Sequence, residues 1–298
     1  MSFTIAHLSD PHLGPTPFPR LRELRLKRFM GFVNWKRSRE RSTDMAALAR
    51  LIVDLKAQAP DHVAATGDVA NIGLPAEHRR AADWLQALGD PADVSFTPGN
   101  HDAYARDSMP SLATAFAPWT AGDDGSTGFP FLRERGEVAL IGLSSALPTG
   151  PLMATGRLGR RQLEALADLL ERTAARGLAR VILIHHPPLA RAGSPLRRLV
   201  DAPAFEAVVA RFGAEAILHG HEHRTMVHFL ASPAARIEGG RIPVLGVPAT
   251  AAAARAPSRR GAYHLVRLER AGANWRVTAR ARGLLPDSGG IGEREAPI

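Results

Sequence analysis

Short apolar runs that end in polar or ionisable residues recur along the chain. Six stand out: "FTIAHLSDPH" (3–12), "HVAATGD" (62–68), "VSFTPGNHD" (94–102), "VALIGLSSA" (138–146), "RVILIHHPP" (180–188) and "AEAILHGHEH" (214–223). Segments with helical periodicity lie between them, at Met45–Ala57, Glu77–Leu88, Arg160–Ala175 and Pro203–Phe212. Strands that alternate with helices predict an α/β layered fold.

The last part of the chain has a different pattern. The stretches "PVLGVPAT", "AYHLVRLER" and "NWRVTARARG" follow one another without a helical segment, which predicts an antiparallel end to the sheet structure. The final "PDSGGIGEREAPI" (286–298) is rich in Gly and Pro and is predicted to be a flexible tail. We find no internal repeat and expect one domain over residues 1–285. "STD" (42–44) and "DAP" (201–203) are predicted helix N-terminal caps.

Composition narrows the chemistry that is available. The 298 residues are 45% apolar and 22% charged, which is ordinary for a globular protein. The chain has no cysteine, so a bound metal would be held by His, Asp, Glu or Asn. The first residues lack the pattern of a secretory signal, and no apolar stretch approaches the roughly 18 residues that span a bilayer. We therefore expect a cytoplasmic protein.

The net charge of +9 comes almost wholly from arginine. It is consistent with a general compositional bias toward Arg and Ala. It is equally consistent with an anionic partner, which could be a nucleotide, a nucleic acid or an anionic lipid. Charge alone does not choose between these interpretations.

Five of the six apolar runs end in residues of the kind that bind metals. They supply Asp10 with His12, Asp68, Asn100 with His101, His185 with His186, and His221 with His223. In an α/β sheet, ligands bind at the carboxyl ends of the strands. Loops at one edge of the sheet can therefore bring these distant residues together.

The types of side chain in this set indicate which metals it could bind. Carboxylates, imidazoles and one amide oxygen, with no thiolate, suit Mn, Fe, Zn or Co. One carboxylate that bridges two cations allows a pair roughly 3.5–4 Å apart, which can activate a water for in-line attack on a phosphoester. The sequence therefore predicts two divalent metal ions and phosphoester hydrolysis without a covalent intermediate.

The same residues carry a family resemblance. "DPH", "GDVAN", "GNHD", "HHPP" and "GHEH" resemble, in order, the signature blocks of the calcineurin-like metallophosphoesterase superfamily over roughly residues 3–250. The resemblance implies two facing mixed β-sheets flanked by helices, a four-layer sandwich with the metals at one end. It implies a first metal bound by Asp10, His12, Asp68 and His223, and a second bound by Asp68, Asn100, His185 and His221.

The resemblance also implies roles for residues beside the metals. His101 would stabilise the transition state or protonate the leaving oxygen, and Asp102 would orient His101. We favour His185 over His186 as the ligand, because the family's ligand directly follows the strand. His219 is expected to be a packed residue rather than a ligand.

One departure bears on the substrate. Where the second block of the family's protein phosphatases has an Asp followed by an Arg, this chain has Asn71 and Ile72. The chain is more similar to the bacterial phosphodiesterase branch, which includes cyclic-nucleotide phosphodiesterases. We expect a phosphodiesterase for a nucleotide-type diester, with nuclease activity as a lesser alternative. A scaffold without activity is disfavoured, because every ligand position is filled.

A basic segment at 19–42 separates the first block from the first regular helix. The segment contains nine Lys and Arg residues and only two acidic residues, Glu23 and Glu40. One helical face carries Leu26, Phe29, Met30 and Val33, with Phe32 and Trp35 at its edge. The segment is either a helix that caps the active-site cleft or an interfacial element for an anionic membrane surface. Nucleic acid is a weaker third partner, because no recognised binding module accompanies the charge. In placement the segment resembles insertions of the superfamily's lipid-linked pyrophosphatases, such as UDP-diacylglucosamine hydrolases.

Overall fold

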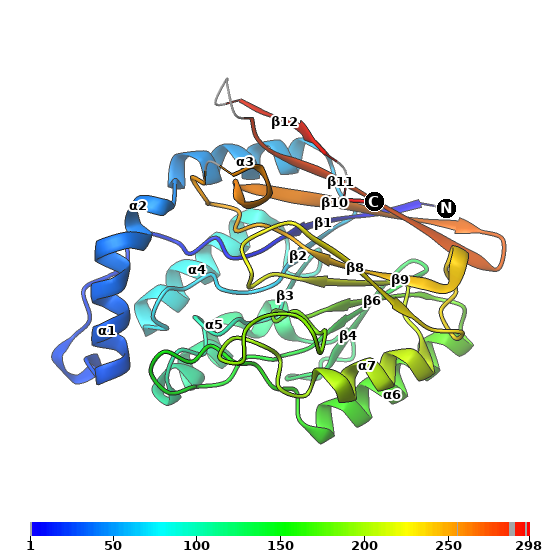
Figure 1. Ribbon diagram of the computed structural model, residues 1–298, viewed down its shortest axis with the longest axis horizontal. Coiled ribbons are helices and arrows are strands. Elements are labelled where there is room, and N and C mark those ends of the chain that lie inside the picture. Colours follow the sequence, from blue (N-terminus) through cyan, green and yellow to red (C-terminus); the bar gives the residue numbers. More distant parts are fainter. Residues whose placement is uncertain (1, 255, 286–289, 296) are drawn as a thin grey trace.

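All six apolar runs contain a β-strand. The computed structural model describes residues 2–254, 256–285, 290–295 and 297–298 (Figure 1). The strands of the six runs are β1 (Ser2–Leu8), β2 (His62–Ala65), β3 (Val94–Phe96), β5 (Val138–Gly142), β6 (Ala179–Leu183) and β7 (Ala216–His219). Each strand stops before the polar residues that follow it, so those residues lie in loops.

The strands form two mixed six-stranded sheets. The first has the order β12 (Ile291–Arg294), β11 (Asn274–Leu284), β10 (Ala262–Ala271), β1, β2, β3. The second has the order β4 (Phe131–Arg135), β5, β6, β7, β9 (Arg241–Gly246), β8 (Met226–Ala231). β1, β2 and β3 are parallel, as are β5, β6, β7 and β9, so the carboxyl ends of the strands that carry the motifs share one edge in each sheet.

Helices cover the outer faces of both sheets. α3 (Met45–Ala57), α4 (Pro75–Leu88) and α5 (Met109–Thr120) pack on the first sheet, and α6 (Arg160–Ala175) and α7 (Ala202–Phe212) pack on the second. Alternate strand residues, such as Ile5, Val181 and Val266, fill the space between the sheets. Because successive residues of a strand point to opposite faces, these strands must be apolar on both sides. The expected four-layer sandwich is confirmed.

The helix predictions succeeded where the apolar periodicity was clear. α3 and α6 have the predicted limits, and the Asp44 side chain caps α3 by accepting a hydrogen bond from Ala47 N at 2.9 Å. Asp201 is the N-cap residue of α7, as predicted, but its side chain makes no capping hydrogen bond there. Its carboxylate instead accepts hydrogen bonds from Leu158 N and Gly159 N, just before α6. α5 was not predicted, since its sequence contains two prolines and no clear polar face.

The basic segment is helical, as expected. After a 3₁₀ turn (Leu21–Glu23) it forms α1 (Leu26–Asn34), a π-helical turn (Trp35–Arg39) and α2 (Glu40–Ser42). It stands at one end of the molecule (Figure 1). Further 3₁₀ turns lie at Arg106–Ser108, Glu238–Gly240 and Pro257–Arg259. Among the described residues, no helix is long and apolar enough to cross a membrane.

The C-terminal part corrects two expectations. β10 and β11 are antiparallel, as predicted, but β9 belongs to the second sheet and runs parallel to β7. Residues 291–294 of the predicted flexible tail form β12, which pairs with β11. The rest of that prediction falls partly on residues 286–289 and 296, which lie outside the described part of the chain.

Candidate metal centre

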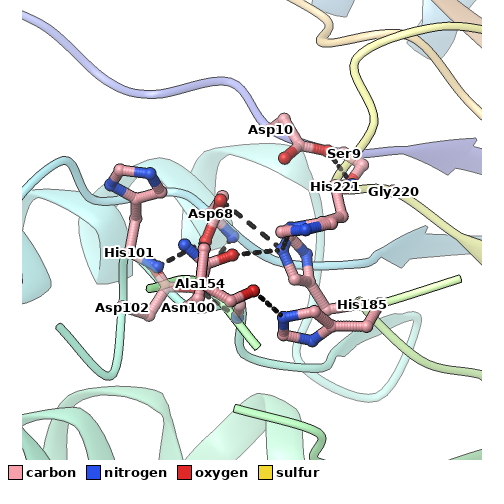
Figure 2. A network of polar contacts seen from close by, with 12 residues as sticks. Ser9, Asp10, Asp68, Asn100, His101, Asp102, Ala154, His185, Gly220 and His221 are labelled. Carbon is pink, nitrogen blue, oxygen red and sulfur yellow. Dashed lines mark hydrogen bonds and ion pairs between the residues drawn. The ribbon is translucent and has the colours of Figure 1, made fainter. Parts of the chain in front are cut away.

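The predicted ligands converge where the two sheets end, and Figure 2 shows five of them, Asp10, Asp68, Asn100, His185 and His221. The loops after β1, β2 and β3 supply Asp10, His12, Asp68 and Asn100 from the first sheet, and those after β6 and β7 supply His185, His221 and His223 from the second. Five of these seven residues have a positive φ, an uncommon conformation for a residue with a side chain (Asp10 52°, His12 42°, Asp68 53°, His221 71°, His223 51°). Such backbone strain persists where the surrounding structure fixes it, and it is concentrated at functional sites.

The first group of ligand atoms comprises Asp10, His12, Asp68 and His223. His223 Nε2 lies 3.2 Å from Asp10 Oδ1 and 3.3 Å from His12 Nε2. His12 Nε2 lies 3.9 Å from Asp68 Oδ2. Each residue offers one ligand atom, and these atoms lie within 4.8 Å of one another. This is the set that the sequence analysis assigned to one metal.

The second group is centred on His185 Nε2. This nitrogen lies 3.5 Å from Asp68 Oδ2, 3.2 Å from Asn100 Oδ1 and 3.2 Å from His221 Nδ1. Asp68 Oδ2 therefore faces both groups. A carboxylate oxygen at this junction has the position that a bridging ligand needs.

The surroundings of His185 and His186 distinguish the two rings. His185 Nδ1 lies 2.7 Å from the Thr66 carbonyl oxygen, to which it donates, so that Nε2 faces the other ligands. His186 comes within 4.8 Å of the ligand atoms of His185 and His221. Its own nitrogens, however, contact Ser145 Oγ at 2.8 Å and the Ala154 carbonyl oxygen at 3.1 Å. This geometry supports His185 as the ligand.

The donor set fits divalent cations. The Nε2 atoms of His12 and His223 lie close together, and so do His185 Nε2 and His221 Nδ1. Only one proton fits between the two nitrogens of each pair, so the second nitrogen directs a lone pair into the site. His221 Nε2 is buried without a hydrogen-bond partner among the described residues. A cation among these lone pairs would satisfy them, and the mixture of imidazole and carboxylate suits Mn, Fe, Zn or Co.

The charges of the site are strongly coupled. Burial alone would raise the pKa of Asp68, but His185, His101 and His12 hold it well below its usual range. Burial lowers the pKa of His185, but the Asp68 charge outweighs it and raises that pKa to about 9. Burial, together with His186 and His185, keeps the pKa of His221 well below its usual value. The ligands thus depend on one another for their ionisation.

Asp102 contacts backbone amides. Its two carboxylate oxygens accept hydrogen bonds from Asp68 N at 2.8 Å, Gly99 N at 2.8 Å and Ala70 N at 2.9 Å. His101 instead places Nδ1 2.5 Å from the Asn71 carbonyl oxygen, and its own amide donates to Asp68 Oδ1 at 2.7 Å. Asp102 was expected to orient His101, but the Asn71 carbonyl oxygen contacts the ring in its place. Asp102 holds the loop that carries Asp68.

His219 is packed in the interior, as expected. It is fully buried at the end of β7, and its Nδ1 lies 3.1 Å from the neighbouring Gly220 carbonyl oxygen. His219 therefore stands apart from the two ligand groups, although it lies in the same short stretch as His221 and His223.

A pocket of about 500 Å³ opens over the ligands. The basic insertion forms one wall with Lys27, Met30, Gly31 and Asn34. Residues 151–154 and Arg197 form another part of the lining. Asp68, Asn100, His101, Tyr104, His221 and His223 line the remainder. The insertion therefore forms part of the cleft. Tyr104 and the 151–154 wall had no signal in the sequence, because they carry no metal-type residue at a strand end.

Two residues of the insertion are anchors rather than surface groups. Arg28 is buried and donates to the carbonyl oxygens of Ile72 and Gly73, each at 3.1 Å, and to Asp107 Oδ2 at 2.6 Å. Trp35, which was expected at the edge of the apolar face, is only 2% exposed. The insertion is thus fastened to the loop that follows Asp68.

The profile of the calcineurin-like phosphoesterases matches residues 3–225. The chain belongs to this family of phosphoester hydrolases. It is 29% identical over 280 residues to a probable cyclic nucleotide phosphodiesterase from Synechococcus sp., covering 93% of this chain and 91% of that protein.

Solved structures share the fold. A dimetal phosphatase from Danio rerio has a TM-score of 0.62 at 14% identity, covering 94% of this chain and 96% of that one. A purple acid phosphatase from yellow lupin has a TM-score of 0.55 at 12% identity, covering 98% of this chain and 53% of that one. At these identities the likeness shows the architecture alone.

Proposed function

We propose that the protein is a metal-dependent phosphodiesterase for a nucleotide-type diester. The observation that carries the proposal is the position of Asp68 between two groups of metal-type ligands, at the floor of a pocket that His101 also lines. The family is dinuclear and metal-dependent, and the ligands here would be Asp10, His12, Asp68, Asn100, His185, His221 and His223. Bound divalent cations would polarise the phosphoryl oxygens and acidify the attacking water.

His101 supplies the proton in this proposal. Because Nδ1 donates its proton to the Asn71 carbonyl oxygen, Nε2 is the nitrogen that can exchange a proton with the substrate. The His12 ring packs edge-on against His101 at 4.9 Å between centroids and limits its rotation. His101 is therefore positioned to protonate the leaving oxygen, a contribution of typically 10²–10⁴-fold for a general acid.

The preference for a diester rests on Asn71 and Ile72. Ile72 stands where the protein phosphatases have an arginine, and it has no charge with which to bind a phosphate. Its side chain is buried, and its carbonyl oxygen accepts a hydrogen bond from Arg28. The pocket volume of about 500 Å³ suits a nucleotide-sized ligand. The similarity to a probable cyclic nucleotide phosphodiesterase supports the same substrate class.

A substrate panel tests this proposal. It contains bis-p-nitrophenyl phosphate, p-nitrophenyl phosphate, cyclic nucleotides, single-stranded DNA and a lipid pyrophosphate, each with added Mn and with chelator. We expect the diester to be hydrolysed better than the monoester that has the same leaving group, and a cyclic nucleotide to be hydrolysed better than DNA. A clear preference for the monoester contradicts the proposal, and DNA as the best substrate would favour a nuclease.

A second candidate keeps this chemistry and takes a lipid-linked diphosphate or diester at the inner face of a membrane. The observation in its favour is a set of exposed apolar side chains on the insertion (Leu21 90%, Leu26 69%, Phe29 54%), together with Phe18 (80%) just before it. Arg20, Arg22 and Arg25 are exposed among them. Apolar groups surrounded by cations are typical of an interfacial membrane element.

A further inference from the structure

The Lys27 ammonium group lies at the pocket without a carboxylate partner. Lys27 is on α1, and Nζ donates to the Tyr104 carbonyl oxygen at 2.7 Å and to Thr149 Oγ1 at 3.0 Å. Nζ also lies 4.4 Å from the centroid of the Tyr104 ring. All three contacts are with neutral groups. Within the described part of the chain, Lys27 forms no ion pair, in contrast to Lys36 of the same insertion, which lies 3.1 Å from Glu40.

Burial makes this unpaired charge costly. Lys27 is half-buried, and desolvation lowers the pKa of its ammonium group to about 8. A cation removed from water is stabilised best by an opposite charge with good hydrogen-bond geometry. Since the described surroundings supply none, an anionic group that enters the pocket is the natural partner for this ammonium group.

The position of Lys27 separates it from the metal ligands. The Tyr104 ring stacks on the His101 ring at 5.6 Å between centroids, so that Tyr104 lies between Lys27 and the reacting end of the pocket. The neighbouring Arg28 fixes this part of α1 to Ile72 and Gly73. Gly31, one turn further along α1, has no side chain where the Tyr104 hydroxyl approaches, which allows α1 to lie this close. Lys27 is therefore held at a fixed place beyond His101.

We propose that Lys27 forms a second anion subsite, which binds a phosphate or carboxylate of the substrate other than the phosphoryl group that is hydrolysed. The inference rests on the proposed function and adds to it that, among nucleotide-type diesters, those that carry another negative charge bind more tightly. The metal ligands and His101 act on the scissile group, and Lys27 contributes to affinity for the remainder of the substrate.

Equilibrium binding of product-like nucleotides to the metal-loaded protein tests the subsite without turnover. The probes are adenosine 5′-monophosphate and the adenosine 3′,5′- and 2′,5′-bisphosphates, measured by calorimetry. A charge-assisted contact predicts that at least one bisphosphate binds the wild-type protein about tenfold more tightly than the monophosphate. Lys27→Met should abolish this ratio, and Lys27→Arg should keep part of it. Lys36→Met is the matched control and should leave the ratio unchanged.

Metal content and thermal unfolding of each variant show whether the site and the fold are intact, and Lys27→Gln, which also removes the charge, stands in if Lys27→Met does not fold. Equal binding of the mono- and bisphosphates by the wild-type protein would overturn the subsite. So would a ratio that survives in Lys27→Met, or a full loss of the ratio in Lys36→Met. If the ratio behaves as expected but no diester is hydrolysed in the substrate panel, the proposed function fails and the subsite stands.

Discussion

Asp68 and His185 belong to different sheets and meet at 3.5 Å, from Asp68 Oδ2 to His185 Nε2. Asp68 follows β2 in the first sheet, and His185 follows β6 in the second. A second bond strengthens this junction, since His185 Nδ1 donates to the carbonyl oxygen of Thr66, two residues before Asp68. The site therefore exists only when the two sheets pack against each other, which links formation of the metal centre to formation of the fold.

Substitutions at Asp68 and His101 should separate metal binding from proton transfer. Asp68→Ala removes the carboxylate shared by both ligand groups, so both the metal content and the rate should fall. His101→Ala removes a ring to which we assign proton transfer and not metal binding, so metal content should persist while turnover falls by about 10²–10⁴-fold. Elemental analysis and steady-state kinetics measure the two effects. Loss of metal from His101→Ala would show that the roles are assigned wrongly.

Asp102→Asn tests whether this residue holds the Asp68 loop. The carboxamide has one acceptor oxygen where the carboxylate accepts from three amides, those of Asp68, Gly99 and Ala70. We expect the free energy of unfolding to fall by about 1–3 kcal/mol, with weaker metal binding. Chemical denaturation and metal titration measure this. A variant with full stability and metal affinity but an altered pH–rate profile would show that Asp102 acts on His101 instead.

His264 is a buried histidine that costs stability. It pairs in register with His7 on the neighbouring strand, and both of its ring nitrogens are buried without hydrogen-bond partners among the described residues. Burial lowers its pKa to about 3, so it is neutral when folded, whereas the unfolded chain binds a proton below about pH 6.5. Protonation of this histidine in the unfolded chain therefore lowers the stability of the fold progressively as the pH falls from about 6.5 toward 3.

His264→Leu should raise the free energy of unfolding by about 1–3 kcal/mol at pH 7 and make the loss of stability in acid less steep. His62 is the matched control, because it is also buried with a pKa lowered to about 3, but its Nε2 contacts Ser95 Oγ at 2.9 Å. His62→Leu removes that bond and should give no gain. Denaturation curves between pH 4 and pH 8 compare the two, and equal effects would refute the explanation.

Vesicle sedimentation tests the membrane candidate. The exposed Arg residues could each contribute roughly 1 kcal/mol near an anionic surface. A membrane role predicts binding to anionic but not neutral vesicles, weakened by salt because the attraction is screened. Leu21→Ser with Phe29→Ser should reduce binding and activity on a lipid substrate, while hydrolysis of a small soluble diester survives. Trp35 is unsuitable for this test because it is buried.

Val53→Ser is the control for vesicle binding, since Val53 is an exposed apolar residue on α3, outside the insertion. It should leave binding unchanged. A protein that stays in the supernatant at low salt, or an equal effect of Val53→Ser, would remove the membrane candidate and leave the insertion as a wall of the cleft.

The ligand cluster could be predicted from the sequence because its residues follow the strands directly. Parallel strands bring their carboxyl ends to one edge, so Asp10, Asp68 and His185 are placed by topology and need no detailed packing. For the insertion, the sequence predicted the helix but not its environment. Its periodicity predicted a helix, but an apolar stripe does not say whether it meets solvent, lipid or protein, and only the tertiary structure buries Trp35 and Arg28.

Other features depended on contacts between distant segments. In the sequence, Lys27 is only one of the nine basic residues of the insertion. Its position at the pocket could not be predicted, because its neutral partners Tyr104 and Thr149 lie far along the chain. β12 was missed because its Gly-rich surroundings are typical of a tail, whereas pairing with the edge strand β11 provides its hydrogen bonds.

The metal content and activity of a single preparation test the central claim most directly. Protein stripped of metal with a chelator and then dialysed should be inactive toward bis-p-nitrophenyl phosphate. Addition of Mn should restore activity as binding reaches about two ions per chain, the number that one shared carboxylate and two ligand groups allow. Full hydrolytic activity in an exhaustively metal-stripped sample would contradict the two-metal account.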